Sequence, residues 1–248
     1  MKSVFEYIAT KSREFDQSPL FVYLRDTNID PVDRLRFVPC SAHFVLTFAD
    51  LYHFFLTEDP PKDRYQELIN IHLAEEGSHW KWFLADLTNL DLDPTLRFTD
   101  ALRFLWSDAT IKTRKLAYDM CKLSAGLTSL EKLVMVHTIE ATGRVALEAA
   151  VPAGRDAAKR VGKNLVYFGQ HHLDTERQHT LEEDHTHAEL EAIALDEQQL
   201  AGLFAIVDKV FASFAEFVEE TFACAKAGRG FDKIIKEARV TSEAVAPN

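Results

Sequence analysis

Five side chains of metal-binding type lie at spacings that place them on common helical faces. His72 and His79 are seven residues apart, which is two turns of an α-helix. His172, Glu176 and His179 stand at positions i, i+4 and i+7, so they share one face of a helix. Imidazole and carboxylate groups gathered in this way suit iron, manganese or zinc. The spacing therefore predicts that two separate stretches direct metal ligands toward a common point.

A sixth candidate ligand, Glu140, stands in an apolar stretch at 132–150. A carboxylate that faces a core needs a partner or a cation, because burying an unpaired charge is costly. Ligands from three helices favour a two-metal site in the core of a helical bundle. We therefore predict a metal site formed by His72, His79, Glu140, His172, Glu176 and His179.

Each of these residues also has an ordinary structural explanation. A single histidine such as His72 on an amphipathic helix is more often a surface or core residue than a ligand. Glu140 can form an ion pair with Arg144, one turn further along the helix. The segment 172–179 favours a metal more strongly, because a solvated face does not need two histidines that frame a carboxylate.

A competing interpretation comes from the motif Glu-x-x-His, which occurs at 76–79 and 176–179 and is typical of ferritin-like di-iron bundles. Such a site needs a further glutamate from the helix before each motif. Glu140 can serve the second motif, but the stretch 15–57 contains no glutamate and offers only Asp50 as a substitute. The ferritin-like fold is therefore the second choice.

Helical periodicity dominates the sequence, and strand patterns are nearly absent. Thr128 and Glu131 predict a capping box at the start of one helix, and Pro152 and Gly154 predict its end. The expected helices are 2–15, a short one from 19, 31–56 with a kink at Pro39, 64–90, 101–106, 111–124, 128–151, 156–187 with a break at Gly169, and 197–227. These elements predict an all-α bundle of about seven helices.

The composition sets limits on the class of protein. The chain has 248 residues, 47% of them apolar, which predicts a single domain over 1–248 with a flexible end after about 239. Its 28 basic and 39 acidic side chains give a net charge of -11, which disfavours nucleic acid and anionic membrane surfaces as partners. No stretch reaches the roughly 18 uncharged apolar residues of a membrane span.

The N-terminal residues and the cysteines add two further expectations. The first residues lack the apolar stretch of a secretory signal, so we expect a soluble, cytoplasmic protein. Cys40, Cys121 and Cys224 are far apart and form no CxxC pair, which argues against a disulfide framework and against a thiolate metal site.

The order of the candidate ligands resembles the haem-oxygenase-like di-iron oxidases and oxygenases, a CADD-like family whose members decarboxylate fatty acids or cleave and N-oxygenate amino acids. The family pattern is a Glu and a His six residues apart, then a lone Glu, then a His-x3-Asp/Glu-x2-or-3-His segment. His79, Glu140, His172, Glu176 and His179 fill five of the six places. Glu140 precedes His172 by 32 residues, as is usual in the family.

The resemblance covers about 40–225 and implies a single-domain haem-oxygenase-like bundle that binds two Fe(II) ions and uses O2 as cosubstrate. The departure from the pattern is His72, where the family has Glu, so that four imidazoles and two carboxylates face two divalent ions. Glu75 and Glu76 lie near the same face and can restore the charge, as a ligand or as a partner of an imidazole. The histidine resembles the nitrile-forming branch of the family, which acts on a tryptophan derivative.

These features together predict a non-haem di-iron oxidoreductase that acts on a small carboxylate-bearing substrate. An amino acid, aromatic in the favoured case, would undergo oxidative C–C cleavage, nitrile formation or a related oxidation. Glu140 and Arg144 are the predicted catalytic residues, Arg144 as a two-pronged donor to the substrate carboxylate. Two alternatives stay open, a ferritin-like di-iron carboxylate protein and a non-catalytic binding or regulatory bundle. The sequence does not decide whether chains pair into homodimers.

Two further sets of residues are candidates for the surroundings of the site. The predicted cavity lining consists of Trp80, Phe83, Val136, Phe168 and Phe204. A helix flanks the site in this fold, and its candidates for contact with the metal-binding side chains are His43, Asp50, Tyr52 and His53.

Overall fold

The computed structural model describes residues 1–176, 178–179, 181 and 184–226. Every regular element in these ranges is helical, so the predicted all-α class is confirmed. The α-helices are α1 (Lys2–Phe15), α2 (Pro19–Arg25), α3 (Pro31–Arg34), α4 (Ala42–Leu51), α5 (Arg64–Glu76), α6 (His79–Asn89), α7 (Phe98–Leu105), α8 (Ile111–Ser124), α9 (Ser129–Val161), α10 (Gln170–Glu176), α11 (Asp184–Glu191) and α12 (Glu197–Lys226). Short 3₁₀ segments lie at Val38–Ser41 and Asp108–Thr110, and a π-helical segment lies at Tyr52–Leu56. The described residues thus hold more helices than the predicted seven or so, because several expected helices are divided.

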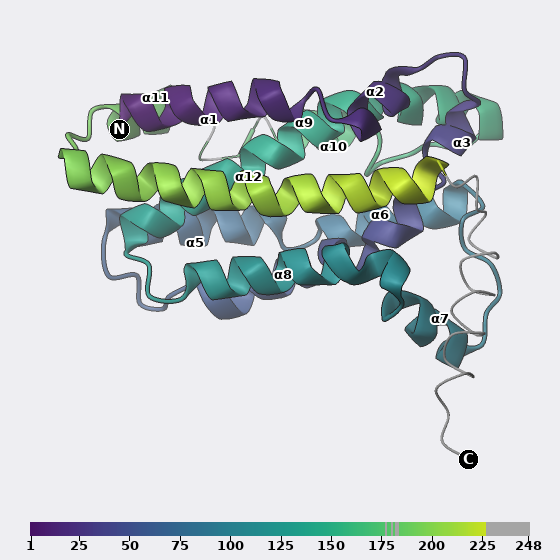
Figure 1. Cartoon of the computed structure of the whole chain (residues 1–248), viewed down its shortest axis with the longest axis horizontal. Helices are drawn as coiled ribbons and strands as arrows, with labels where there is room; N and C mark the ends of the chain where they lie inside the picture. Colours follow the sequence, from purple (N-terminus) through teal and green to yellow (C-terminus); the bar gives the residue numbers. More distant parts are fainter. Residues whose placement is uncertain (177, 180, 182–183, 227–248) are drawn as a thin grey trace.

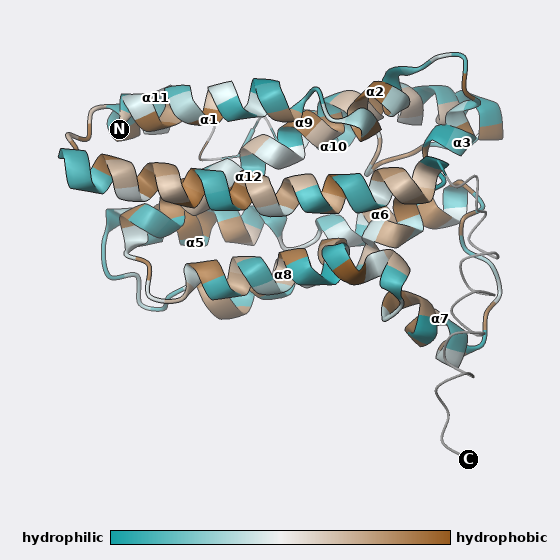
Figure 2. Ribbon diagram, viewed as in Figure 1, coloured by the Kyte–Doolittle hydropathy of each residue, from teal (hydrophilic) through white to brown (hydrophobic). Residues whose placement is uncertain are grey.

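The two longest helices, α9 and α12, form the centre of the bundle. α9 contacts α1, α2, α3, α5, α10 and α12. Figure 1 shows α12 running between α1 and α8. Hydrophobic residues recur along α12 between hydrophilic ones (Figure 2), and Leu203, Val207, Phe211 and Phe214 on its inner face are buried. The core therefore lies between α12, α9 and the helices around them.

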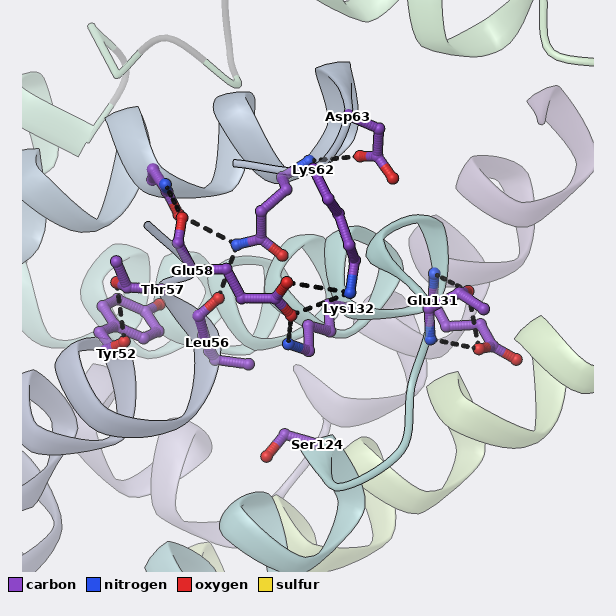
Figure 3. A network of polar contacts seen from close by, with 12 residues as sticks. Tyr52, Leu56, Thr57, Glu58, Lys62, Asp63, Ser124, Glu131 and Lys132 are labelled. Carbon is purple, nitrogen blue, oxygen red and sulfur yellow. Dashed lines mark hydrogen bonds and ion pairs between the residues drawn. The ribbon is translucent and has the colours of Figure 1, made fainter. Parts of the chain in front are cut away.

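Several predicted boundaries agree with the structure. α1 and α8 begin and end where the sequence predicts. The capping box of α9 is confirmed, since the Thr128 hydroxyl accepts a hydrogen bond from the Glu131 backbone N–H over 3.3 Å and the Glu131 carboxylate accepts one from the Thr128 N–H over 2.8 Å (Figure 3). These features depend on residues that are close in sequence.

The prediction of one kinked helix at 31–56 is wrong. α3 ends at Arg34, a 3₁₀ segment surrounds Pro39, and α4 starts only at Ala42. Proline has no N–H to donate and disfavours helical geometry in the residue before it, so the break is complete rather than a kink. The buried Arg34 side chain stabilises this arrangement by donating a hydrogen bond to the Leu24 carbonyl over 3.0 Å.

The prediction of one helix at 64–90 is also wrong, because Gly77 and Ser78 separate α5 from α6. Glycine and serine are poor residues for a helix interior, which favours a break at this point. The consequence for the site is that Glu76 is the last residue of α5 and His79 is the first residue of α6.

The predicted end of the next helix at Pro152 and Gly154 is contradicted, since α9 continues through both residues to Val161. Gly154 serves close packing instead. A Cβ atom at this position would lie 1.9 Å from the Phe168 carbonyl oxygen, so only glycine lets this loop approach α9. The helix ends at Gly162, whose φ of 67° is left-handed.

The predicted helix at 156–187 is therefore not one element. Its first residues belong to α9, a loop follows, and α10 ends at Glu176. α11 then begins at Asp184. The predicted flexible end after 239, and residue 227 at the end of the last predicted helix, lie outside the described residues.

A polar network holds the turn between the π-helical segment and α5 (Figure 3). The backbone N–H and the hydroxyl of Thr57 both donate to the Tyr52 carbonyl over 3.0 Å. Glu58 accepts a hydrogen bond of 2.6 Å from Lys132 on α9, and Gln66 on α5 donates one of 2.7 Å to the Leu56 carbonyl. The network therefore joins three elements and fixes the backbone that carries Tyr52.

Two expectations about the chain as a whole concern its thiols and its helices. The three cysteines form no disulfide; Cys40 is buried, and Cys121 and Cys224 are half-buried. Among the described residues, no helix has the length and apolar character needed to cross a membrane.

Candidate metal centre

The structure brings all six predicted ligands together in the interior of the bundle. The four histidines are almost inaccessible, with exposed fractions between 1% and 6%, and the side chains of Glu140 and Glu176 are 14% and 13% exposed. α5 contributes His72, α6 contributes His79, and α9 contributes Glu140. α10 contributes His172 and Glu176, while His179 lies in the turn beyond it.

One half of the cluster forms where α5 meets α9. The His72 Nε2 atom lies 3.1 Å from the Glu140 Oε1 atom. On the other side of the same ring, Nδ1 lies 3.8 Å from the Glu75 carboxylate. The pairing joins helices whose contact residues are 68 positions apart in sequence.

The other half of the cluster surrounds Glu176. This carboxylate lies 2.8 Å from His172 Nε2, 3.3 Å from His79 Nδ1 and 3.2 Å from His179 Nδ1. The rings of His79 and His179 are nearly parallel, with centroids 5.6 Å apart. The i, i+4 spacing of His172 and Glu176 thus places both on one face of α10, as predicted.

A seventh residue, Glu76, belongs to the cluster. Its Oε2 atom lies 2.9 Å from His79 Nδ1 and its Oε1 atom lies 2.9 Å from His179 Nδ1. Glu76 is 6% exposed. The sequence offers Glu76 only as a replacement for lost charge, although its place in a Glu-x-x-His motif is the signal that identifies it.

The donor atoms of the cluster are better placed to bind a cation than to form hydrogen bonds with one another. Among the described residues, both nitrogens of His72 and of His179, the His79 Nδ1 atom and the Glu76 Oε1 atom have no aligned hydrogen-bond partner. This holds even for His72 Nε2, His79 Nδ1 and His179 Nδ1, each of which lies 2.9 to 3.1 Å from a carboxylate oxygen. Buried polar atoms without partners are costly. A metal ion between them would satisfy nitrogen and oxygen donors at once, so this set of residues fits a metal.

The donor atoms fall into groups of metal-site size. Glu76, His79, Glu176 and His179 form one group, and His72, Glu76 and Glu140 form another, with the ligand atoms of each group within 4.8 Å of one another. A third combination, His72, Glu75 and His179, meets the same limit. The first two groups share Glu76, which is the arrangement expected of two adjacent metal positions.

The pKa values of the clustered groups reflect their mutual charges. Burial lowers the pKa of His79, but the carboxylates of Glu176 and Glu76 outweigh it and raise that pKa to about 9. The same carboxylates raise the pKa of His179 to about 10, again against the effect of burial. Burial raises the pKa of Glu176, yet the surrounding imidazoles hold it far below its usual range. Metal binding would therefore displace protons from these imidazoles.

His172 is oriented by a loop that α6 holds in place. The His172 Nδ1–H donates to the Tyr167 carbonyl over 2.9 Å, which directs Nε2 toward Glu176. The carboxylate of Asp86 accepts hydrogen bonds from the backbone N–H groups of Val166 and Phe168, over 2.8 and 2.9 Å. Asp86 has no exposed surface. Sequence analysis missed this residue, because nothing near it in sequence indicates that it binds a loop 80 residues away.

Glu140 has a second contact, with Tyr52 of the π-helical segment. The Tyr52 hydroxyl donates to Glu140 Oε1 over 2.5 Å. Burial raises the pKa of Glu140, and the positive charge of His72 opposes that rise. Burial and the neighbouring Glu140 charge also raise the pKa of Tyr52, so the hydroxyl stays protonated and able to donate.

Four residues of the flanking segment are predicted to contact a metal ligand: His43, Asp50, Tyr52 and His53. Of these, the structure places only Tyr52 beside the cluster. His43 packs against Trp106, with ring centroids 5.7 Å apart. His53 is exposed beside Phe54, and Asp50 is exposed. Tyr52 lies one helical turn after Phe48, which packs against it and lines the cavity, whereas Asp50 and His53 lie on the exposed face.

A cavity of about 190 Å³ opens onto the cluster. All seven cluster residues line it, and so does Arg144, which lies one helical turn beyond Glu140. The rest of the lining is mainly apolar and comes from α2, α4, α9 and α12, including Phe21, Phe44, Phe48, Phe214 and Phe217.

The predicted lining is correct in part. Trp80 and Phe168 line the cavity. Phe83 and Val136 are fully buried in the core and are not part of the lining, and Phe204 packs against Tyr7. Helical periodicity identifies the inward face of a helix but not which core residues border a space.

Comparison of the sequence with protein-family models finds no match, and comparison with curated proteins finds none either.

Proposed function

We propose that this protein is a non-haem di-iron oxidoreductase that uses O2 to oxidise a small carboxylate-bearing molecule. The observation that carries the proposal is the buried cluster of four imidazoles and three carboxylates, several of whose converging donor atoms have no aligned hydrogen-bond partner among the described residues. Two Fe(II) ions held there would supply electrons for the reduction of O2 while the substrate is oxidised. Imidazole and carboxylate ligands in a helical bundle are the set that favours iron in this role.

The chain's own residues have three tasks in this proposal. His72, Glu140 and the residues around Glu176 hold the metal positions, and Tyr52 and Tyr167 orient two of the ligands. The aromatic wall of the cavity excludes water from the reacting groups. Exclusion of water would favour oxidation of the enclosed substrate over side reactions with solvent.

The lining of the cavity supports the proposed substrate class. Arg144 lines the cavity, and a guanidinium can bind a substrate carboxylate through two parallel hydrogen bonds. The apolar remainder of the lining suits a hydrophobic side chain, and its many phenylalanine rings favour an aromatic one. An aromatic amino acid such as tryptophan or a derivative is therefore the proposed substrate, with oxidative C–C cleavage or nitrile formation as the proposed outcome.

Anaerobic titration with Fe(II), followed by mixing with O2 and candidate amino acids, tests the proposal. We expect two Fe(II) per chain and consumption of an aromatic amino acid that depends on both iron and O2. His172→Ala and Glu140→Ala should each lose iron and activity. His43→Ala, at a half-buried histidine that packs against Trp106 and is not part of the cavity lining, is the matched control and should retain both. Retention of two irons by both ligand variants would refute the proposed site.

A ferritin-like iron protein is the second candidate, because Glu76 with His79 and Glu176 with His179 face each other across the cluster. Such a protein oxidises iron without an organic substrate. Oxidation of iron by O2 at a rate unaffected by every aromatic amino acid, with storage of iron beyond two ions per chain, would favour it over the oxidase.

A further inference from the structure

Glu76 occupies a special position within the cluster. It is the residue common to the four-residue group with His79, Glu176 and His179 and to the three-residue group with His72 and Glu140. It is also the last residue of α5, followed directly by the break that turns the chain into α6. The side chain therefore lies between the two halves of the cluster.

Each carboxylate oxygen of Glu76 faces a different imidazole. Oε2 lies 2.9 Å from His79 Nδ1, and Oε1 lies 2.9 Å from His179 Nδ1. Neither nitrogen is aligned for a hydrogen bond to its neighbour, and Oε1 has no hydrogen-bond partner among the described residues. Both imidazoles belong to the four-residue group, and a Glu76 oxygen also lies within 4.8 Å of donor atoms of His72 and Glu140, so one carboxylate reaches both groups, as a bridge between two ions requires.

Charge supports the same role. Two divalent ions bring four positive charges, and the six ligands predicted from the sequence offset only two of them, because imidazoles are neutral as ligands. Glu76 raises the number of carboxylates to three within a buried site, where an uncompensated charge is expensive. It compensates for the histidine at position 72.

Glu75 is the competing carboxylate. It forms a possible donor group with His72 and His179, but its side chain is 30% exposed and lies 3.8 Å from His72 Nδ1. It belongs to neither of the two groups that share Glu76. Exposure to water weakens its electrostatic effect on the site.

We propose that Glu76 is a metal ligand and that its carboxylate bridges the two metal positions. This inference rests on the proposed two-metal function. It adds a seventh ligand, and it places the shared ligand at the C-terminal end of α5.

Binding of Mn(II) to the purified full chain tests the bridge independently of activity. Equilibrium dialysis measures the number of ions and their affinities, and electron paramagnetic resonance distinguishes a magnetically coupled pair from isolated ions. We expect the natural sequence to bind two Mn(II) as a coupled pair. Glu76→Gln should lose the coupling and weaken at least one site by about tenfold or more.

The matched variant is Glu75→Gln, which removes the neighbouring carboxylate and should keep two coupled ions. Glu76→Asp retains the charge on a shorter side chain, and circular dichroism of each variant verifies that the helices are formed. Two coupled ions in Glu76→Gln would overturn the bridge and leave the two-metal function intact. Failure of the natural sequence to bind any Mn(II) or Fe(II) would overturn the proposed function itself.

Discussion

The hydroxyl of Tyr52 donates a 2.5 Å hydrogen bond to the carboxylate of Glu140, across 88 positions of sequence. The donor comes from a π-helical turn and the acceptor from the middle of α9. In metal sites, hydrogen bonds from residues that do not themselves bind the metal orient the ligands, and their loss typically lowers the metal affinity by roughly 10–100-fold.

Tyr52→Phe removes this donor and keeps the ring. We expect the Fe(II) affinity to fall about 10–100-fold, because Glu140 loses the hydrogen bond that holds it toward His72. Isothermal titration under anaerobic conditions measures the change. Tyr118→Phe, at an exposed position of α8, is the control and should bind iron normally. An unchanged affinity in Tyr52→Phe would show that Glu140 needs no such support.

Asp86 is expected to position His172 without contacting a metal. Asp86→Ala leaves the N–H groups of Val166 and Phe168 without their acceptor, and each should cost about 1–3 kcal/mol of unfolding free energy. Asp86→Asn retains one carbonyl oxygen and should cost less. Urea unfolding gives the stability of each variant, and metal titration gives the affinity. Weaker metal binding in Asp86→Asn, with the fold intact, is the result that a purely structural role would not produce.

The metal-free protein should lose stability as the pH rises above neutrality. The folded state holds protons on His79 and His179 with pKa values of about 9 and 10, whereas the unfolded chain releases them near 6.5. The resulting stabilisation is complete below pH 6.5 and disappears as the pH rises through 9 and 10. Thermal unfolding between pH 6 and pH 10.5 measures this loss.

His79→Gln with His179→Gln should flatten that pH dependence, since neither side chain can then be protonated. A metal ion should flatten it as well, because coordinated imidazoles carry no displaceable proton. An unfolding temperature of the natural metal-free chain that stays level across this range would contradict the proposed charge state of the cluster.

Gly154 and Gly202 form a matched pair of helix glycines. Gly154→Ala should destabilise the protein by about 1–3 kcal/mol, since its Cβ would collide with the Phe168 carbonyl. Gly202→Ala on α12 meets no atom within 4 Å and should stabilise by about 0.4–1 kcal/mol. Denaturant unfolding compares the two, and equal effects would contradict the close packing of the loop on α9.

Arg144→Lys tests recognition of the substrate carboxylate. Lysine keeps the charge but cannot make two parallel hydrogen bonds, so we expect KM for an aromatic amino acid to rise about tenfold with a smaller change in kcat. The corresponding amino-acid amide, which lacks the carboxylate, should be affected little. A similar loss with acid and amide would assign Arg144 a structural role.

Local sequence was sufficient to predict the helical class, the start of α9 at its capping box, and the pairing of His172 with Glu176. Each of these depends on residues within about one or two turns of each other, where periodicity and backbone hydrogen bonds decide the outcome. The residue types of the candidate metal site also came from the sequence alone, because histidines and carboxylates at helical spacing in apolar stretches are unusual.

Tertiary packing decided what the spacing could not. Gly154 and Pro152 indicate a helix end locally, but burial of the α9 surface against the loop at Phe168 keeps the helix intact. The contacts of Asp86 with that loop and of Tyr52 with Glu140 join residues 80 or more positions apart, so no local pattern encodes them. From the sequence, Glu76 is only a residue that can restore charge. The structure places it in the middle of the cluster, because the chain breaks after Glu76 and the direction of its side chain depends on how α5 and α6 meet.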